Sequence, residues 1–492
     1  MGRRYLLPFL AVAFEAVASA GAQTMPVVQN NGELKALAVP PSAGVVYRSG
    51  FATAGDGGDM TYRYVPSACA TGRGAGDDGA DVKPARGAGC WVATFSQGAN
   101  ARVWGALGAP ASTDDTGALQ RALTWACGPQ ARALRIAAGR YYHTGLTIRG
   151  SCHIFGDGRG ETLLQQQSNT ASDIVVRGTG SEKVTLSDMF LIPAVKKIAG
   201  YAIEFHQAYF PTLERVDLTG WNGVLDDSSA SMTVANLNMS DLNGVYGIKF
   251  IGHNASPAAV FGAILDNVVG SAKNNRHLTW LDMDSYSYSV TLKSGIFMYG
   301  AKCIVMEDTA AVQGGASVPK WLFVPHLECD HPFETGVHLI KGQNVTIAAG
   351  SWIGSSQTGN GIATEPGWSG GLTVSGARIN GNLLSGVLLG GGRDIKIMEN
   401  EITANGQGRD GIRHDELTVG REVSDIKIVN NFISREGHDN SAVDRFCISI
   451  DKTIGGHLYI VGNSVYGCSA GSIEGSPVGP HVRISANDGQ DY

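Results

Sequence analysis

The sequence predicts an all-β solenoid, a body of short strands that wind around one axis. Glycine accounts for 67 of the 492 residues and charged residues for only 17%. That composition suits many short strands joined by many turns. The chain is too long for one ordinary hydrophobic core. A repeat in the C-terminal third and evenly spaced cysteines indicate the same architecture.

The repeat can be counted in five segments. Each has an apolar residue, a small residue or Asn three positions later, and a second apolar residue two positions after that. Steps of 27, 23, 31 and 32 residues separate the first positions, which are Ile347, Val374, Ile397, Ile428 and Ile460. Asn400, Asn431 and Asn463 share one position of the turn, where amides can form a ladder. Repeats of this length fit a solenoid better than a TIM barrel, which needs long helices between its strands.

The eight cysteines form sequential pairs separated by 21, 25, 26 and 21 residues: Cys69/Cys90, Cys127/Cys152, Cys303/Cys329 and Cys447/Cys468. One turn of a solenoid brings backbones to a spacing of ~4.8 Å, within disulfide reach. We therefore favour these four bridges among the roughly 105 connectivities that eight cysteines allow. The alternative is that some cysteines are free buried thiols.

The first 22 residues have the features of a signal peptide. Arg3 and Arg4 are followed by a short apolar stretch at 5–14 and by small residues at 18–22 that suit cleavage. The stretch is too short to span a bilayer. We therefore expect a secreted or periplasmic protein without a membrane partner, as the cysteines also indicate. The net charge of −6 argues against a nucleic-acid partner.

A small β module and a capping helix are predicted ahead of the repeat. Residues 24–100 alternate short aromatic and β-branched runs with Gly/Asp turns, which predicts a small β module. Residues 101–492 are assigned to the solenoid. Apolar residues at a spacing of three or four predict a helix from Thr116 to Cys127 that covers the open end of the strand stack. Asp114 or Asp115 is expected to be its N-cap rather than a catalytic acid.

Several motifs surround this helix: Trp104-Gly105-Ala106, Asp114-Asp115-Thr116, Leu119-Gln120-Arg121-Ala122 and Ile154-Phe155-Gly156-Asp157-Gly158. Together they resemble the first turns of the pectate-lyase superfamily of right-handed parallel β-helices, a segment also common in phage tailspikes. Residues 43–104 resemble the small adaptor domain that precedes many tailspike β-helices. The sequence departs at 108–112, where a Gly-Asp-Gly turn is typical. The resemblance implies a right-handed parallel β-helix and a homotrimer, and it is almost silent on substrate.

A second strand in each turn opens at Ile304, Val337, Ile362, Val387, Ile412 and Ile448. The third residue after each opening predicts a surface column of Glu307, Ile340, Glu365, Gly390, Asp415 and Asp451. Asp415 and Asp451 are then expected roughly 5 Å apart, which suits the paired carboxylates of glycosidases. Arg413 and His414 lie beside them, and arginine grips acidic sugars well. The alternative is that these carboxylates are solvated turn residues.

A second acidic cluster surrounds Glu328 and Asp330, which alternation places on one face at about 6–7 Å. His331 and the aromatic Trp321 are close in sequence, and Trp321 is a candidate platform for a sugar ring. Three interpretations stay open: catalysis, carbohydrate contact without catalysis, and a plain exposed corner.

The sequence thus favours a polysaccharide-active protein, a hydrolase rather than a lyase. The catalytic candidates are Glu328, Asp330, Asp415 and Asp451; the substrate contacts are Glu307, Glu365, Trp321, His331, Arg413 and His414. The alternatives are a non-catalytic carbohydrate-binding or adhesin module and a structural, spike-like protein. No cofactor is expected, and calcium stays open as an alternative, because the resemblance to pectate lyases implies a calcium site of clustered aspartates with a basic residue. Asp282 and Asp284 are the nearest match, and two residues are too few to assign such a site.

Overall fold

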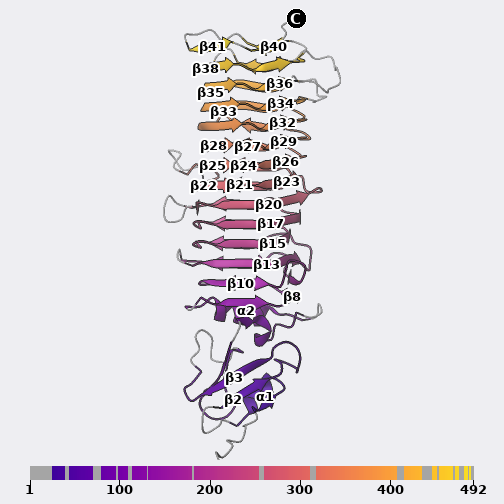
Figure 1. Cartoon of the computed structure of the whole chain (residues 1–492), viewed down its shortest axis with the longest axis vertical. Coiled ribbons are helices and arrows are strands. Elements are labelled where there is room, and N and C mark those ends of the chain that lie inside the picture. The colour runs from indigo at the N-terminus through magenta and orange to yellow at the C-terminus, as the bar shows by residue number, and fades with distance from the viewer. Residues whose placement is uncertain are drawn as a thin grey trace, which may run out of the picture.

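The computed structural model describes residues 25–38, 44–69, 79–95, 98–108, 113–129, 131–179, 182–253, 260–310, 317–406, 415–434, 446–451, 454–468, 471–475, 481–485 and 487–488. They form a tall column of stacked strands with a small sheet at its N-terminal end (Figure 1). The predicted signal peptide, Ile412, Arg413 and His414 lie outside the described residues.

The small sheet has the strand order β1-β2-β3-β5-β4. Its elements are β1 (Val27–Val28), α1 (Asn31–Ala36), β2 (Val45–Arg48), β3 (Met60–Val65), β4 (Asp81–Val82) and β5 (Cys90–Ala93). Arg48 is fully buried and donates from Nη2 to the carbonyl of Val103, which ties the sheet to the first turn of the column.

The column begins with β6 (Ala99–Asn100), the 3-10 helix η1 (Ala101–Trp104) and the helix α2 (Thr116–Ala126). The apolar side of α2 is buried against the first strands, as the sequence predicts. Asp115 is the N-cap residue by position, but its Oδ1 accepts from the N–H of Leu107. Asp114 instead accepts from the N–H of Thr116, so the two aspartates share the task of fixing this end of the helix.

Above α2 each complete turn adds one strand to each of three parallel faces, named A, B and C in chain order. Face A contains the first halves of β13 (Val184–Pro193), β15 (Thr212–Gly220), β17 (Thr233–Leu242) and β20 (Ile264–Ala272), and the second halves of β33 (Val387–Met398) and β35 (Leu417–Val429). Its other strands are β7 (Ala133–Ile136), β10 (Cys152–Gly156), β19 (Val260–Phe261), β22 (Ser287–Leu292), β25 (Lys320–Val324), β28 (Gln343–Ile347), β31 (Gly370–Ser375), β38 (Gly455–Val461) and β41 (Val482–Ser485).

Face B contains the second halves of β13, β15, β17 and β20. Its other strands are β8 (Gly139–His143), β11 (Thr162–Gln166), β23 (Gly295–Tyr299), β26 (Leu327–Asp330), β29 (Trp352–Gly354), β32 (Arg378–Asn380), β34 (Glu401–Thr403), β36 (Phe432–Ser434) and β39 (Ser464–Tyr466).

Face C contains the first halves of β33 and β35. Its other strands are β9 (Leu146–Ile148), β12 (Ile174–Arg177), β14 (Tyr201–His206), β16 (Asn222–Asp227), β18 (Tyr246–Ile251), β21 (Thr279–Met283), β24 (Lys302–Met306), β27 (Val337–Leu339), β30 (Ile362–Thr364), β37 (Phe446–Ile450) and β40 (Gly471–Glu474). All inter-turn pairings are parallel, which confirms the predicted solenoid.

One hydrophobic cluster fills the column from α2 to the last turns. It forms because side chains alternate along each strand, so every second residue points inward. The counted repeat has the predicted register: Ile347 pairs with Val374, Val374 with Ile397, Ile397 with Ile428, and Ile428 with Ile460.

The predicted asparagine ladder is present at the corner between faces A and B. Asn400 Nδ2 donates to Asn431 Oδ1 at 3.0 Å, and Asn431 Nδ2 donates to Asn463 Oδ1 at 2.9 Å. A second ladder, which the sequence did not reveal, joins Asn382 to Asn405 and ends on the buried carboxylate of Glu416.

The four predicted disulfides are confirmed. The Cα–Cα distances are 4.7 Å for Cys69–Cys90, 4.5 Å for Cys127–Cys152, 5.9 Å for Cys303–Cys329 and 5.6 Å for Cys447–Cys468. Within the described part of the chain, no helix is both long and apolar enough to cross a membrane.

Candidate functional site: an ionisable row on face C

Face C carries a row of ionisable side chains on its outer side. In β14, the buried Ile203 and Phe205 alternate with the outward-facing Glu204 and His206. Because the strands of successive turns pair in parallel, the residues at one outward position lie above one another along the column. One series is Glu204, Leu225, Lys249 and Asp282; the neighbouring series is His206, Asp227, Ile251, Asp284 and Glu307. The ionisable row is defined as Glu204, His206, Asp227, Lys249, Asp282, Asp284 and Glu307.

The lower part of the row is a histidine cluster of Glu204, His206 and Asp227. His206 Nε2 lies 2.8 Å from Glu204 Oε2, and His206 Nδ1 lies 3.0 Å from Asp227 Oδ2. The exposed His253 approaches the other oxygen of Asp227 at 3.0 Å. The three side chains of the cluster are 18–24% exposed, so a ligand can reach them.

This geometry sets the protonation of the cluster. The hydrogen bonds to Asp227 and Glu204 raise the pKa of His206 to about 9, because both carboxylates favour the charged imidazolium. Burial alone would raise the pKa values of Glu204 and Asp227, but hydrogen bonding to His206 outweighs it and lowers both. At neutral pH the cluster therefore holds one proton donor between two ionised carboxylates.

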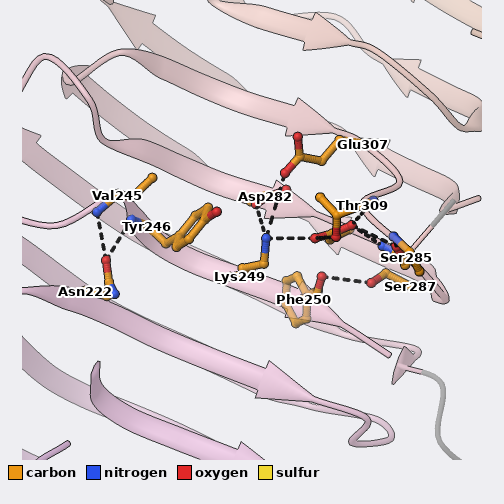
Figure 2. Close-up of polar contacts among 12 residues, drawn as sticks. Asn222, Val245, Tyr246, Lys249, Phe250, Asp282, Ser285, Ser287, Glu307 and Thr309 are labelled. Carbon is orange, nitrogen blue, oxygen red and sulfur yellow. Dashed lines mark hydrogen bonds and ion pairs between the residues drawn. The ribbon is translucent and has the colours of Figure 1, made fainter. Parts of the chain in front are cut away.

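The upper part of the row is a lysine cluster of Lys249, Asp282, Asp284 and Glu307. Lys249 Nζ lies 2.9 Å from Asp282 Oδ2, 2.9 Å from Asp284 Oδ2 and 3.8 Å from Glu307 Oε1. Figure 2 shows Lys249 pointing toward Asp282, with Glu307 on the next turn. Glu307 is 26% exposed, whereas the side chains of both aspartates are only 1% exposed. Glu307 is therefore the carboxylate of this cluster that solvent reaches.

The two aspartates titrate differently. Burial raises the pKa of Asp282 to about 7, and its Oδ1 has no hydrogen-bond partner among the described residues. Burial also opposes ionisation of Asp284, but hydrogen bonds from Lys249 and Thr309 lower its pKa overall. Burial would lower the pKa of Lys249, yet the attraction of Asp282 and Asp284 raises it. Lys249 thus stays charged inside a largely dry cluster.

The resemblance to pectate lyases raises the question of calcium. Asp282, Asp284 and Glu307 offer oxygen atoms that all lie within 4.8 Å of one another. A calcium ion needs about six to eight oxygen ligands. The ammonium group of Lys249 stands among these carboxylates, where a cation would be held. These residues therefore do not fit a resident calcium ion while Lys249 is in place.

The predicted carboxylate column is partly correct. Glu307, Ile340 and Glu365 follow one another in register on face C, and Glu365 Oε1 lies 2.7 Å from His338 Nε2. Asp451 follows the end of its strand in the same way. Asp415 does not belong to the column. The strand of that turn pairs from Leu417, which lies opposite Val387 and Ile448, so Asp415 precedes the strand.

The predicted pairing of Asp415 with Asp451 is therefore wrong. Asp415 Oδ1 accepts from the N–H of Phe446, at the start of β37, whereas Asp451 follows the end of β37. The strand of this turn begins at Leu417 and not at the predicted Ile412, because the turn contains extra residues.

The predicted acidic cluster around Glu328 is distributed over two faces. Glu328 and Asp330 share the outer side of β26 on face B, as alternation predicts, and Asp330 contacts His331. Trp321 lies on face A instead, in β25. The structure does not bring Trp321 together with the two acids, and the catalytic role of the acids stays a prediction.

Sequence reasoning missed four members of the ionisable row: Glu204, His206, Asp227 and Lys249. The available signal was a charged residue flanked by apolar ones, as in Ile203-Glu204-Phe205 and Ile248-Lys249-Phe250. The spacing between strands varies in this region, so a count along the sequence does not place one charge above another.

The parallel strand stack defines a right-handed parallel β-helix protein. Among solved structures, the chain is similar to the gp42 tailspike of Acinetobacter phage vb_AbaP_AS12, at 12% identity and a TM-score of 0.53, covering 94% of this chain and 75% of that one. It is also similar to tailspike gp49 of Acinetobacter baumannii bacteriophage Fri1, a capsular polysaccharide depolymerase, at 13% identity and a TM-score of 0.51, covering 82% and 74%.

A third similar structure is bacteriophage CBA120 tailspike protein 3, at 12% identity and a TM-score of 0.50. The match covers 77% of this chain and 62% of the tailspike, so this chain spans less than two thirds of that protein. A scan against protein-family models found no match. A search of curated proteins also found none. At these identities the similarity concerns the fold.

Proposed function

We propose that the protein cleaves glycosidic bonds of a polysaccharide at the ionisable row. The observation that carries the proposal is the imidazolium of His206 held between two ionised carboxylates in a partly exposed site. Acid and base groups whose surroundings separate their pKa values can share the proton transfers of hydrolysis. Here the acid is an imidazolium, whereas most glycosidases use a carboxylic acid. The fold supports the substrate class, because a long straight face suits a long chain and one similar tailspike is a polysaccharide depolymerase.

In the proposed reaction, His206 donates its proton to the glycosidic oxygen as the bond to the anomeric carbon breaks. A water molecule attacks the anomeric carbon and gives its proton to Glu204 or Asp227. The proton then returns to His206, so the net change is one water added across the bond. The exposed His253 is placed to contact an acidic sugar, and the lysine cluster fixes the neighbouring turns of the face.

The test uses the intact, oxidised protein and a panel of bacterial exopolysaccharides. Reducing ends report hydrolysis, and absorbance of unsaturated uronates reports elimination. His206→Gln, Glu204→Gln and Asp227→Asn are each expected to lower kcat by about 10²–10⁴. His457→Gln is the matched control, since His457 forms a similar pair with Asp425 on face A, 3.0 Å apart.

Two outcomes contradict the proposal. One is wild-type protein that binds a panel glycan and yields no product. The other is activity that survives His206→Gln but is lost in Glu328→Gln or Asp330→Asn, which places the chemistry on face B as the sequence first suggested. Binding without cleavage is the result expected of a carbohydrate-binding or adhesin module.

We also propose that the protein acts outside the cytosol. Four disulfides support this, because such bonds persist in oxidising compartments. N-terminal sequencing of exported protein tests the proposed cleavage after residue 20 or 22. The homotrimer that the tailspike resemblance implies stays a prediction, which light scattering of the purified protein checks.

A further inference from the structure

A groove of about 600 Å³ lies on face A, which is a different face from the ionisable row. It crosses five consecutive turns, from β22 to β33. Turns stack at ~4.8 Å, so the groove is roughly 19 Å long. Its lining residues are Ser289, Val290, Thr291, Trp321, Leu322, Phe323, Asn344, Thr346, Gly371, Thr373, Asp394 and Lys396.

One edge of the groove consists of five residues with left-handed backbone conformation, one at the equivalent position of each successive strand. The φ angles are 60° at Ser289, 63° at Trp321, 63° at Asn344, 76° at Gly371 and 55° at Asp394. Ser, Asn, Gly and Asp are small, and three of them are residues that adopt this conformation readily. A tryptophan there is an outlier that the fold does not require, since Asn344 fills the same position one turn later.

The two ends of the groove differ in chemistry. At the lower end, Trp321 is 51% exposed and Phe323 is 45% exposed, although both are large apolar side chains. Tyr288 supports Trp321, with ring centroids 6.1 Å apart. The centre is lined by hydroxyl and amide groups of residues such as Thr346 and Asn344. Such a lining can stack on the apolar side of a sugar ring and also bond its hydroxyls.

The upper end of the groove carries charge of both signs, because Asp394 and Lys396 are both exposed on β33 and both line the groove. Lys396 lies directly below Lys427 in register, so two ammonium groups occupy neighbouring turns. Lys427 is placed over the ring of Tyr459, 6.0 Å from its centroid. Lys396 has no ion-pair partner among the described residues. The two lysines are complementary to an anion, and the carboxylate of Asp394 can accept hydrogen bonds from sugar hydroxyls.

We propose that this groove binds a strand of acidic polysaccharide along the column axis, as a second site separate from the ionisable row. Trp321 and Phe323 stack on sugar rings, the central hydroxyl and amide groups bond sugar hydroxyls, and Lys396 pairs with a uronate carboxylate. The inference rests on the proposed function for the class of ligand but on none of its residues. In this inference, the groove on face A binds the polysaccharide and the ionisable row on face C cleaves it.

A second copy of the chain is the other possible occupant, and the lining argues against it. Interfaces between copies bury roughly 800 Å² on each partner around an apolar centre. Here the apolar residues lie at one end, and threonine, asparagine and glycine residues form the centre.

The test measures binding of the intact protein to polygalacturonate, alginate and hyaluronan as acidic probes, with dextran as the neutral probe, by affinity electrophoresis and calorimetry. Trp321→Asn removes the ring and places at this position the residue that the next turn carries. It is expected to weaken binding at least tenfold. Lys396→Gln is expected to weaken binding of acidic probes and to reduce its salt dependence, with no effect on dextran.

Matched controls are Phe432→Ala, an exposed aromatic residue on face B, and Lys273→Gln, an exposed lysine after β20. His206→Gln is expected to retain full affinity while losing cleavage. Failure of the proposed function and failure of this inference are therefore distinguishable, because wild-type protein that binds without cleaving contradicts only the former.

Three results overturn the inference. The first is no binding of any acidic probe by the wild-type protein. The second is Trp321→Asn with wild-type affinity and a native circular dichroism spectrum. The third is a change of oligomeric state in Trp321→Asn, measured by light scattering, which shows that the groove is a contact between copies.

Discussion

Replacing Lys249 with methionine tests the lysine cluster most directly. Methionine keeps the unbranched length of the side chain and removes the charge. Without the ammonium group, Asp282, Asp284 and Glu307 remain within 4.8 Å of one another in a poorly solvated site. Removing one partner of a buried ion pair typically costs about 3–5 kcal/mol, because it leaves uncompensated charge.

The magnitude translates into a measurable shift. The unfolding entropy is about 2.1 cal/mol/K per residue, or about 0.8 kcal/mol/K for a cooperative unit of roughly 400 residues. A loss of about 3–5 kcal/mol then lowers Tm by about 4–6 °C. The loss is expected to be larger at pH 8 than at pH 5. In the wild type, burial raises the pKa of Asp282 to about 7 although Lys249 lowers it, so removal of Lys249 raises this pKa further. At pH 5 the carboxyl is therefore protonated in the variant, and one unpaired charge disappears.

The assay is thermal unfolding followed by circular dichroism, with and without millimolar calcium chloride. Calcium is expected to raise the Tm of Lys249→Met by a few degrees and to leave the wild-type Tm unchanged, since a ligand stabilises only a fold that binds it. Asp282→Asn added to Lys249→Met is expected to recover part of the loss. Lys293→Gln is the control, because its pair with Asp266 is about half exposed and contributes little.

The reasoning is refuted if Lys249→Met melts within 1 °C of wild type at pH 8, or if calcium stabilises the wild-type protein as strongly as the variant. The first result shows that the cluster is solvated, and the second that Lys249 does not stand in for a cation.

Three further predictions concern the same fold. NMR titration should give His206 a pKa of about 9, above the unfolded value of 6.5. The charged imidazolium therefore contributes ~1–2 kcal/mol to the free energy of unfolding, and this contribution is complete below pH 6.5 and lost as pH rises through 9. The stabilities of His206→Asn and the wild type should accordingly converge near pH 9. Asn431→Leu should cost about 3 kcal/mol, since it leaves buried groups of both ladder neighbours unpaired, whereas the exposed Asn169→Ala should leave Tm unchanged. Replacing Cys303 and Cys329 with serine should cost about 2–5 kcal/mol by thermal unfolding, and a reductant should then shift Tm less than in wild type.

The sequence predicted the regular part of the fold well, because local rules govern it. Alternating apolar residues, one per turn from Ile347 to Ile460, fixed the strands and their register. The asparagine ladder followed from the same count, and the disulfides followed from the match between cysteine spacing and turn length. Each of these features recurs from turn to turn, so the assignment made for one turn can be checked against the sequence of the next turn.

The candidate site was predicted only in part. Glu307 and Glu365 were placed in one column because each lies three residues after an apolar residue that opens a strand, and these openings are in register. Asp415 was misplaced because the turn before Leu417 is longer, and a count from a single chain does not show where extra residues are accommodated. Trp321 was grouped with Glu328 because they are close in sequence, although a corner of the column separates their faces.

The chain by itself determined that short strands stack, which residues point inward, and which cysteines meet one turn apart, because these depend on spacing along the sequence. Only the tertiary structure decided that His206 lies between Glu204 and Asp227, and that Lys249 neutralises carboxylates more than thirty residues away. Vertical neighbours in a solenoid are set by the summed lengths of all intervening loops. Loop length varies from turn to turn, so the spacing of charged residues along the sequence does not show which of them pair. The pairing of charges on neighbouring turns is therefore known only from the tertiary structure.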